Sequence, residues 1–314
     1  MARVLVTGGA GFIGAHTVRA LLKRGQAVTV LDDLSTGAES NLTALAGDLE
    51  FVKGTVCSDD DIQRSLRSVD RIIHLAAVVS VVRSVNDPVG CDAVNVHGTV
   101  RLLDRARHAQ IRRIVFASSA AVYGEDPSQP KVESARIEVL SGYAASKACG
   151  ELYMQMFHRL YHMEPVVLRY FNVFGPRQNP KSQYAAVIPT FIDCMLKGTP
   201  PTVNGDGEQT RDFCCVDNVV DANLRALESR DAVGRVINIG TGTRTSLNQL
   251  LDMLGVIGNT RLAPIFGPAV LGDLRHSVAD ISLARTLMDY APRVSLTEGL
   301  AQTVAYLRQV QSLA

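Results

Sequence analysis

The stretch TGGAGFIG at residues 7–14 decides the fold of this chain. A short apolar segment at 2–7 leads into it, an amphipathic helical pattern runs from about 12 to 24, and a second apolar segment follows at 27–31. This order predicts a strand, a helix and a second parallel strand, with the glycines at the first strand-to-helix turn.

The glycines of this turn, Gly8, Gly11 and Gly14, are spaced more widely than in the standard G-x-G-x-x-G fingerprint. Glycine lets such a turn tighten and lets backbone N–H groups approach a pyrophosphate at the positive end of a helix. A glycine-rich turn without a ligand is the alternative. The complete strand–helix–strand pattern favours a dinucleotide site.

Two acidic residues, Asp32 and Asp33, end the second strand. A carboxylate at this place accepts hydrogen bonds from a ribose 2′-hydroxyl and repels a 2′-phosphate. No Lys or Arg follows closely, because the next residues, 34–37, are LSTG. The sequence therefore predicts NAD rather than NADP.

Strand patterns then alternate with helical ones. Strands are expected at 50–52, 71–75, 113–117, 166–169 and 236–239, and the main helices at about 92–109 and 143–162. This alternation predicts an α/β fold, a Rossmann-type doubly wound parallel sheet with a smaller α/β C-terminal substrate domain. The turns after Leu75, Ala117 and Arg169 should line one crevice with the glycines, because ligands bind at the carboxyl ends of such strands.

Two domains are expected. Pro and Gly become frequent after Arg169, which indicates short and irregular elements. Residues 1–170, with a later return segment at about 214–240, are predicted to form the NAD-binding domain, and 171–314 mainly the substrate domain.

The composition excludes several classes of function. The 314 residues carry a net charge of +1 with no basic block, so a nucleic-acid partner is not indicated. No apolar run could span a bilayer, and the N-terminus lacks the pattern of a signal peptide. The six cysteines show no CxxC spacing and no companion His cluster, so no metal is expected and reduced thiols in a cytoplasm are the simplest interpretation. The adjacent Cys214 and Cys215 are expected in the core.

Tyr143 and Lys147 are candidate catalytic residues, because residues four apart share one helical face and an ammonium favours the phenolate. By itself this spacing more often belongs to a surface helix. Ser118 and Ser119 follow a predicted strand and should face the cofactor crevice, where the alternative is a serine-rich turn. Ser119, Tyr143 and Lys147 beside NAD would form a proton relay for hydride chemistry on an alcohol.

Over essentially its whole length the sequence resembles the extended short-chain dehydrogenase/reductases, and among them the UDP-hexose 4-epimerases of UDP-glucose and UDP-N-acetylglucosamine. The blocks that carry the resemblance are 7–14, 32–37, 74–77, 95–99, 118–124, 143–147, 169–178, 205–213 and 272–280. The resemblance implies that Tyr143 takes the proton of the sugar 4-hydroxyl while C4 gives hydride to NAD. It implies that Lys147 lowers the pKa of Tyr143 and bonds the nicotinamide ribose, and that Ser119 orients the 4-oxygen. Hydride then returns to the other face of the 4-keto sugar.

The resemblance also implies binding residues. Those for NAD are Gly8, Gly11, Phe12, Ile13, Gly14, Asp32, Asp33, Ser35, Thr36, Gly37, Val56, Leu75, Ala76, Ala77, Asn95, Tyr143, Lys147 and Tyr170. Those for the UDP-sugar are Ser80, Ser118, Asn172, Gln178, Ala186, Val187, Val203, Asn204, Arg211, Asp273 and Ser277. Arg211 is expected on the diphosphate, Asn172 on phosphate and sugar, and Asp273 on the uridine ribose. An ion pair of Arg211 with Asp212 or Asp217 is the alternative.

Three positions depart from the family pattern. Relatives commonly have a diphosphate Arg at the place of Val270, so Arg275 or another base compensates, or the diphosphate is held less tightly. Thr55 stands where an Asp often contacts adenine. Ser141-Gly142 stands where a Pro usually precedes the Tyr.

The small Ser277 favours 2-acetamido sugars, because relatives with a Tyr there are thought to exclude them. Asn172, Gln178 and Ala186 agree with this, and Val79 does not. The sequence thus predicts interconversion of UDP-GlcNAc and UDP-GalNAc, with UDP-Glc and UDP-Gal as further substrates.

Other activities on the same scaffold are the alternatives. Dehydratases and decarboxylases usually carry acidic residues where this chain has Ala120 and Ala121, which argues against both. A 4-keto reductase and a non-catalytic NAD-binding sensor are the remaining candidates. The resemblance implies a homodimer through the helix at 143–162 and the long helix that precedes it. The apolar set of the 143–162 helix, Ala144, Leu152, Met156 and Leu160, fits such an interface but could equally face the sheet. The pathway, galactose use or a surface polysaccharide, is left undecided.

Overall fold

The computed structural model describes residues 2–43, 45–178, 187–260, 262–269 and 275–312. It begins with the predicted strand–helix–strand unit. Strand β1 (Arg3–Thr7), helix α1 (Phe12–Lys23) and strand β2 (Ala27–Asp32) follow one another, and β1 pairs in parallel with β2. Every residue of β2 is buried, as expected for an inner strand covered on both faces.

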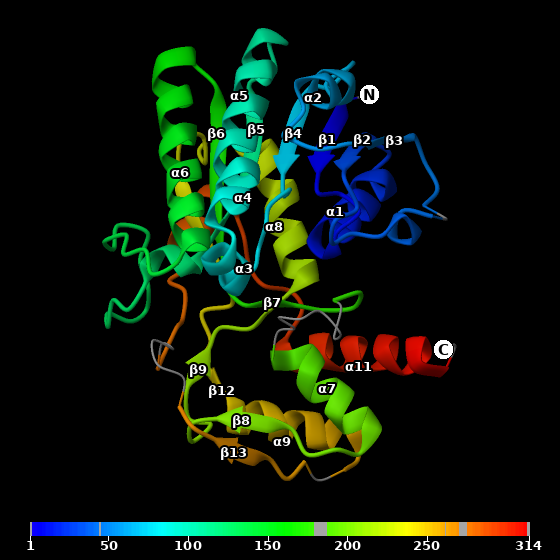
Figure 1. Ribbon diagram of the computed structural model, residues 1–314, viewed down its shortest axis with the longest axis vertical. Coiled ribbons are helices and arrows are strands. Elements are labelled where there is room, and N and C mark those ends of the chain that lie inside the picture. Colours follow the sequence, from blue (N-terminus) through cyan, green and yellow to red (C-terminus); the bar gives the residue numbers. More distant parts are fainter. Residues whose placement is uncertain (1, 44, 179–186, 261, 270–274, 313–314) are drawn as a thin grey trace.

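Seven parallel strands form the main sheet, in the order β11-β6-β5-β4-β1-β2-β3. The other five are β3 (Leu49–Lys53), β4 (Arg71–His74), β5 (Arg113–Ser119), β6 (Glu164–Tyr170) and β11 (Val236–Ile239). Because all run in one direction, their carboxyl ends meet at one edge, which faces the smaller C-terminal part of the molecule (Figure 1). The predicted fold class is confirmed.

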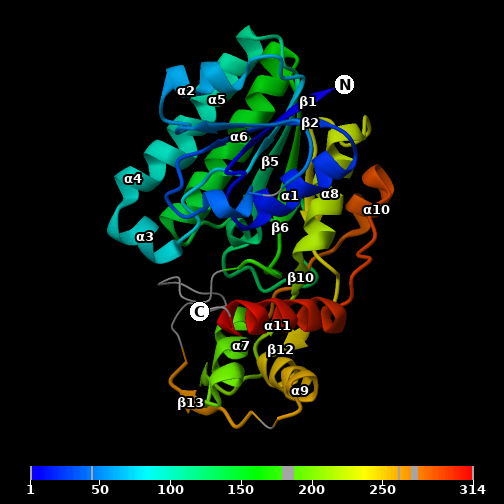
Figure 2. The ribbon, with the colours of Figure 1, turned by 90° about the vertical axis from the view of Figure 1, so that its right-hand side faces the viewer.

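Helices cover both faces of this sheet (Figure 2). One face carries α1, α8 (Val216–Glu228) and α10 (Ser282–Met288); the other carries α2 (Asp59–Ser65), α5 (Gly98–His108) and α6 (Gly142–Tyr161). Each face buries a separate apolar cluster. Both α8 and β11 return to this sheet after the chain has entered the C-terminal part.

The helix expected at about 92–109 is not regular. Short helices α3 (Val81–Asn86) and α4 (Pro88–Asp92) precede a π-helical turn, η2 (Ala93–His97), which continues into α5. Turns of this kind are frequent at functional sites. Here the turn carries Asn95, whose side chain is buried against its neighbours.

The smaller part has its own apolar core. It contains α7 (Val187–Lys197), β8 (Thr202–Asn204), β9 (Thr210–Arg211), β12 (Thr245–Ser246), α9 (Leu247–Gly258), β13 (Ile265–Gly267) and α11 (Leu296–Ser312). Strand β7 (Val173–Phe174) pairs with β10 (Cys214–Cys215) between the two parts, and both cysteines are buried as expected. Single 3₁₀ turns lie at η1 (Glu39–Asn41) and η3 (Ala120–Tyr123). The division at residue 170 stays a prediction.

Across the described ranges, none of the helices combines the length and apolarity that crossing a membrane requires.

Candidate active site

The glycine turn after β1 is built for close approach of a ligand to its backbone. Gly8 has a φ of 69°, and a Cβ on it would lie 2.8 Å from the Ala76 nitrogen. A Cβ on Gly14 would lie 2.7 Å from the Gly9 Cα, so both positions need glycine. Gly11 caps α1 without a side-chain hydrogen bond, which leaves the N–H groups of the first turn, at Phe12 and Ile13, directed at the sheet edge. These donors fit the pyrophosphate of NAD.

Asp32, at the end of β2, lies beside this turn with 7% of its surface exposed. Its carboxylate accepts hydrogen bonds from the backbone of Ala10 (2.9 Å) and Leu34 (2.8 Å). Burial raises its pKa, and the backbone hydrogen bonds oppose that shift. Since a carboxylate has about four acceptor sites, Asp32 can hold the turn and still accept from a ribose hydroxyl.

The following loop packs on the glycine turn. A Cβ on Gly37 would lie 2.8 Å from the Ala10 carbonyl carbon, so the loop backbone touches the turn directly. Asp33 is exposed and accepts a hydrogen bond from the Ser35 backbone at 2.9 Å, and Thr36 is exposed beside it. The structure thus places all the predicted residues of 32–37 around one rim.

Ser119 and Tyr143 come together at the carboxyl edge of the sheet. Ser119 ends β5 and accepts from the Ala121 backbone at 3.2 Å, while Tyr143 lies in the first turn of α6. The Ser119 hydroxyl lies close enough to the Tyr143 phenol to lower the pKa of that phenol. Two neighbouring hydroxyls can share the oxygen and proton of a substrate alcohol.

The pKa of Tyr143 does not follow the sequence-based expectation. Burial raises it, and the nearby Ser119 hydroxyl opposes that shift. Lys147 was expected to lower it, but its ammonium donates to the Ala117 carbonyl at 2.8 Å and lies 6.0 Å from the centre of the Tyr143 ring. Burial lowers the pKa of Lys147 to about 8.

The departure from the family pattern before Tyr143 has a structural reason. Ser141 caps α6, accepting from the Ala144 backbone at 3.1 Å. A Cβ on Gly142 would lie 2.8 Å from the Ser84 carbonyl oxygen. Glycine at 142 therefore lets α3 pack directly on the start of α6.

Ser118, expected to bind substrate, is instead directed into the interior. Its hydroxyl donates to Glu151 Oε1 at 2.5 Å, and Arg169 forms a bidentate pair with the same carboxylate at 2.9 and 2.7 Å. All three side chains are at most 3% exposed. Sequence reasoning gave Glu151 no role, although its place four residues after Lys147 puts it on the same helical face.

The other predicted NAD residues lie at the same edge, in different surroundings. Leu75, Ala76 and Ala77 follow β4 and are partly exposed, whereas Val56 is buried in an apolar cluster. Tyr170 is buried, and its hydroxyl donates to Asn223 at 2.5 Å.

Asn95 is buried as well. Its amide accepts from the Val78 nitrogen at 2.7 Å and donates to the Val78 oxygen at 3.0 Å and to Ser146 at 2.9 Å. Asn95 therefore fixes the loop after β4 to α6.

The predicted UDP-sugar residues gather around β9. Arg211 on β9 is half-buried and donates to the Thr210 oxygen at 2.9 Å, and the Ser277 backbone donates to the same oxygen at 3.1 Å. Asn172 is exposed and donates to the Asp212 oxygen at 3.4 Å. The carboxylate of Asp212 accepts instead from the backbone of residues 241, 242 and 279.

Of the remaining predicted substrate residues, Gln178 has the surroundings that best fit a ligand-binding role. Its Oε1 is buried and finds no hydrogen-bond partner among the described residues, as expected of an acceptor that awaits a ligand. Asn204 and Val187 are accessible, whereas the side chain of Val203 lies in the core of the smaller part. Ser80 caps α3. Ala186, Val270 and Asp273 lie outside the described residues.

The surroundings of Arg275 and Thr55 bear on two of the departures from the family pattern. Arg275 forms an exposed bidentate ion pair with Asp206 at 2.7 and 2.8 Å, which it would have to leave to reach a diphosphate. At Thr55 the backbone nitrogen donates to the Asp61 carboxylate at 3.0 Å, so a carboxylate does lie beside this position.

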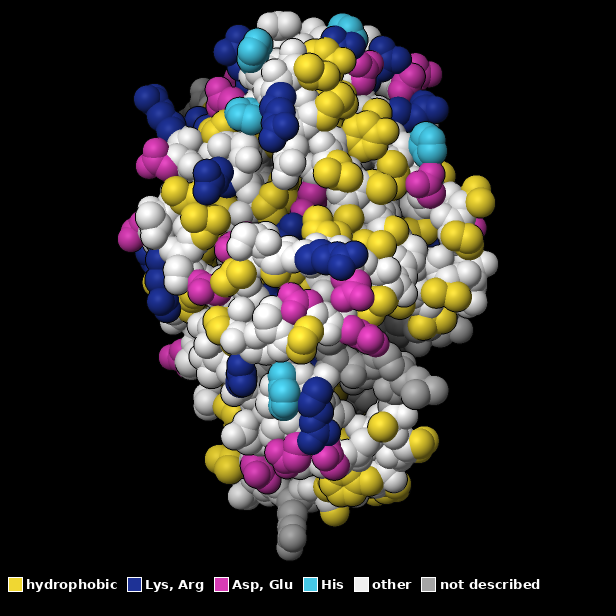
Figure 3. Space-filling model, turned by 90° about the vertical axis from the view of Figure 1, so that its left-hand side faces the viewer, with side chains coloured by type: hydrophobic (Ala, Val, Ile, Leu, Met, Phe, Trp, Pro, Cys, Tyr) yellow, Lys and Arg dark blue, Asp and Glu magenta, His cyan; other side chains and the backbone are white. Residues whose placement is uncertain are grey.

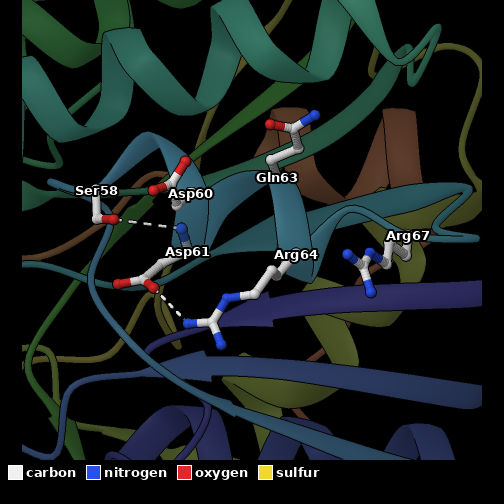
Figure 4. Close-up of a pocket in the computed structure, with 6 residues that line it drawn as sticks. All are labelled: Ser58, Asp60, Asp61, Gln63, Arg64 and Arg67. Atoms are coloured by element: carbon white, nitrogen blue, oxygen red, sulfur yellow. Dashed lines mark hydrogen bonds and ion pairs between the residues drawn. The ribbon is translucent and has the colours of Figure 1, made fainter.

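A surface hollow lies beside α2 (Figure 4). Ser58 caps α2 through the Asp61 backbone, and Asp61 pairs with Arg64, so the polar groups drawn there stabilise the helix. Among the described residues no group of His, Cys, Asp and Glu could hold a metal ion.

The fold and site define a class: an NAD-dependent enzyme of the short-chain dehydrogenase/reductase type, with Ser119, Tyr143 and Lys147 at the cofactor edge. The chain matches the NAD dependent epimerase/dehydratase family over residues 4–240 and belongs to that family. The predictions of the family and of NAD are thereby confirmed.

Individual relatives agree over the full length. The UDP-glucose 4-epimerase of Mycolicibacterium smegmatis is 42% identical over 311 residues, covering 98% of both proteins. The UDP-N-acetylglucosamine 4-epimerase from Methanobrevibacter ruminantium, solved in complex with UDP-N-acetylmuramic acid, superposes with a TM-score of 0.94 at 38% identity, covering 98% of this chain and 99% of that one. The UDP-glucose 4-epimerase of Thermotoga maritima, solved with UDP-glucose, gives a TM-score of 0.93 at 37% identity and the same coverage.

Proposed function

We propose that this NAD-dependent UDP-sugar 4-epimerase interconverts UDP-GlcNAc and UDP-GalNAc, and that it also accepts UDP-Glc and UDP-Gal. The observation that carries the proposal is the small side chain of Ser277 beside the strand of Arg211. The similarity to a protein named a UDP-N-acetylglucosamine 4-epimerase supports it.

The catalytic groups have separate tasks. Bound NAD supplies the acceptor and then the donor of the C4 hydride. Ser119 holds the 4-oxygen, and the neighbouring Tyr143, as its phenolate, takes the 4-hydroxyl proton and later returns it. The buried ammonium of Lys147 donates to the Ala117 carbonyl and would also bond the nicotinamide ribose of bound NAD. No net redox change results.

To act as the base, Tyr143 must first lose its own phenol proton, and its raised pKa opposes that loss. Burial causes that rise, so the opposing effect of the nearby Ser119 hydroxyl is part of what makes the phenol usable as a base. The two positions directly after Ser119, Ala120 and Ala121 at the start of η3, offer no acid–base pair for elimination. This favours epimerisation over loss of water.

Sugar preference is assigned to Ser277. Its backbone is fixed to the Thr210 oxygen at 3.1 Å, so its side chain has a set position beside β9. Only 7% of its surface is exposed, and a phenol at this place would occupy space that a serine leaves to the substrate. A 2-acetamido group requires that space, whereas a 2-hydroxyl does not.

The test is incubation of the enzyme with each of the four UDP-sugars and analysis of the products. In the Ser277→Tyr variant, kcat/KM for UDP-GlcNAc and UDP-GalNAc is expected to fall by more than about tenfold, whereas kcat/KM for UDP-Glc and UDP-Gal should be retained. Ser277→Ala, which keeps the position small, serves as the matched control and should retain all four.

Other outcomes would point elsewhere. An enzyme that turns over UDP-Glc but neither acetamido sugar refutes the proposed preference. A 4-keto-6-deoxy product, or net consumption of NADH, indicates a dehydratase or a reductase. A Tyr143→Phe variant that retains full biological activity favours the NAD-binding sensor.

We also propose that the enzyme is a homodimer formed through the outer face of α6. The predicted apolar set divides there: Ala144 is 1% exposed against the core, whereas Leu152 is 61% and Leu160 63% exposed. Figure 3 shows hydrophobic side chains gathered on the upper half of the side of the molecule that carries α6. The cytoplasmic location stays a prediction from the sequence, and the pathway stays undecided between galactose use and a surface polysaccharide.

A further inference from the structure

A buried histidine joins three elements beneath the active site. His74 ends β4 with 1% of its surface exposed. Its Nδ1 lies 2.7 Å from the Thr7 hydroxyl at the end of β1, and its Nε2 lies 2.9 Å from the Thr99 hydroxyl in α5. Neither the acid–base chemistry nor the predicted ligand contacts use this residue.

The direction of each hydrogen bond follows from its neighbours. The Thr99 hydroxyl donates its proton to the Asn95 carbonyl at 2.6 Å, so it accepts a proton from His74 Nε2. A neutral imidazole carries one N–H, so Nδ1 must accept from the Thr7 hydroxyl. The Thr7 oxygen in turn accepts from the Ala76 nitrogen at 3.2 Å.

This series of hydrogen bonds starts at the glycine turn that is predicted to bind NAD. Ala76 touches Gly8 so closely that a Cβ on the glycine would lie 2.8 Å from the Ala76 nitrogen. Thr7 directly precedes Gly8 in sequence. The relay of Ala76, Thr7 and His74 therefore fixes both walls of the glycine turn.

The series of hydrogen bonds ends at α6, the helix that carries Tyr143. Asn95, whose carbonyl receives the Thr99 proton, donates to the Ser146 hydroxyl at 2.9 Å. Ser146 donates to the Tyr143 carbonyl at 2.8 Å. Hydrogen bonds thus run without interruption from the glycine turn to the backbone of Tyr143.

We propose that His74 is a positioning residue which, as the neutral Nε2–H tautomer, sets the placement of the Tyr143 helix relative to the NAD-binding turn. A charged imidazole would donate from both nitrogens, so its Nδ1 could no longer accept the hydrogen bond from the Thr7 hydroxyl. The surroundings keep it neutral: burial lowers its pKa to about 3, the Lys147 cation acts in the same sense, and the Phe116 ring lies 5.7 Å from it.

The first test reads the tautomer directly. In holoenzyme labelled with ¹⁵N-histidine, His74 is identified by the resonances missing from His74→Gln. At pH 7 its Nδ1 should show the shift of an unprotonated nitrogen and its Nε2 that of a protonated one. An Nδ1–H tautomer or an imidazolium at pH 7 overturns the proposal.

The second test separates positioning from folding. Thr99→Val keeps the shape but removes the hydroxyl, and Thr99→Ser keeps the hydroxyl. Thr99→Val is expected to lower kcat per bound NAD by about tenfold to a hundredfold with KM for the UDP-sugar little changed, because small misplacements of reacting groups are costly. Thr99→Ser should restore kcat.

Thermal unfolding of the same variants completes the comparison. If Thr99→Val retains kcat, or if Thr99→Ser loses as much kcat as Thr99→Val, the series of hydrogen bonds does not set the catalytic geometry and the proposal fails. If Thr99→Val does not fold, His74→Gln and the tautomer measurement on the parent enzyme decide, since His74→Gln should then fold and lose kcat.

Discussion

At the scale of the residue, Lys147 carries its ammonium where burial disfavours charge, with the Ala117 carbonyl as its hydrogen-bond partner. Its pKa is about 8 in the folded chain and about 10.4 in an unfolded one. Between these values the unfolded state binds one more proton than the folded state, so stability rises with pH in this window.

Lys147→Met should remove this dependence. The parent protein, freed of NAD, is expected to gain roughly 3 kcal/mol in free energy of unfolding relative to Lys147→Met between pH 8 and pH 10.4. Urea unfolding of both proteins at pH 7.5 and at pH 10.5 measures the difference. Parallel pH profiles for the two would contradict the assignment of the low pKa to Lys147.

The positions of site residues could be predicted where their spacing on a helix, or their place at the end of a strand, puts them at the carboxyl edge of the sheet. Ser119 and Tyr143 lie near each other, because β5 ends and α6 begins at the same edge of the sheet. The raised pKa of Tyr143 was not predictable, since it depends on the burial of the phenol in the folded chain. The inward direction of Ser118 depends likewise on a partner, Glu151, far away in sequence.

At the scale of the element, α6 and β6 are joined by the buried pair of Glu151 and Arg169. Glu151→Leu should destabilise the protein by about 3–5 kcal/mol, because it leaves the guanidinium buried without a counter-charge. Arg169 keeps its charge, since its pKa stays above the ordinary value through the hydrogen bond and attraction of Glu151. Chemical denaturation gives the difference.

Two matched variants make this test specific. Arg159→Leu removes an exposed charge from the same helix and should change stability by less than about 0.5 kcal/mol. The double variant Glu151→Leu/Arg169→Met should be more stable than Glu151→Leu alone, because no unpaired charge remains. Equal losses for the single and double variants would show that lost packing, not charge, is responsible.

Element types followed from the sequence more reliably than their irregularities. The glycine turn, the strands and the helix of Tyr143 had strong periodic signals, and β11 lies at the predicted 236–239. The π-helical turn at 93–97 had none; it carries Asn95, whose buried side chain bonds to Val78 and Ser146. Tertiary hydrogen bonds of this kind leave no periodic trace in the chain.

At the scale of the whole molecule, the outer face of α6 exposes apolar side chains that the sheet does not cover. Leu152 and Leu160 lie two helical turns apart on this face, and Tyr161 is 43% exposed beside them. A monomer would leave these side chains in water, whereas a second copy packing the same face against them would bury both sets. Sequence alone left the inward and outward faces of α6 unresolved, since its apolar set was compatible with either.

Charge on this face should therefore separate the subunits. The parent enzyme is expected to be a dimer by light scattering coupled to gel filtration, and Leu152→Glu/Leu160→Glu a monomer, because burying two carboxylates per subunit costs more than the apolar contact contributes. Val256→Glu is the control: it puts the same charge on α9, where Val256 is 83% exposed, and should leave the dimer intact. A monomeric parent at micromolar concentration, or a dimer that survives both Leu→Glu changes, would place any subunit contact elsewhere or remove it.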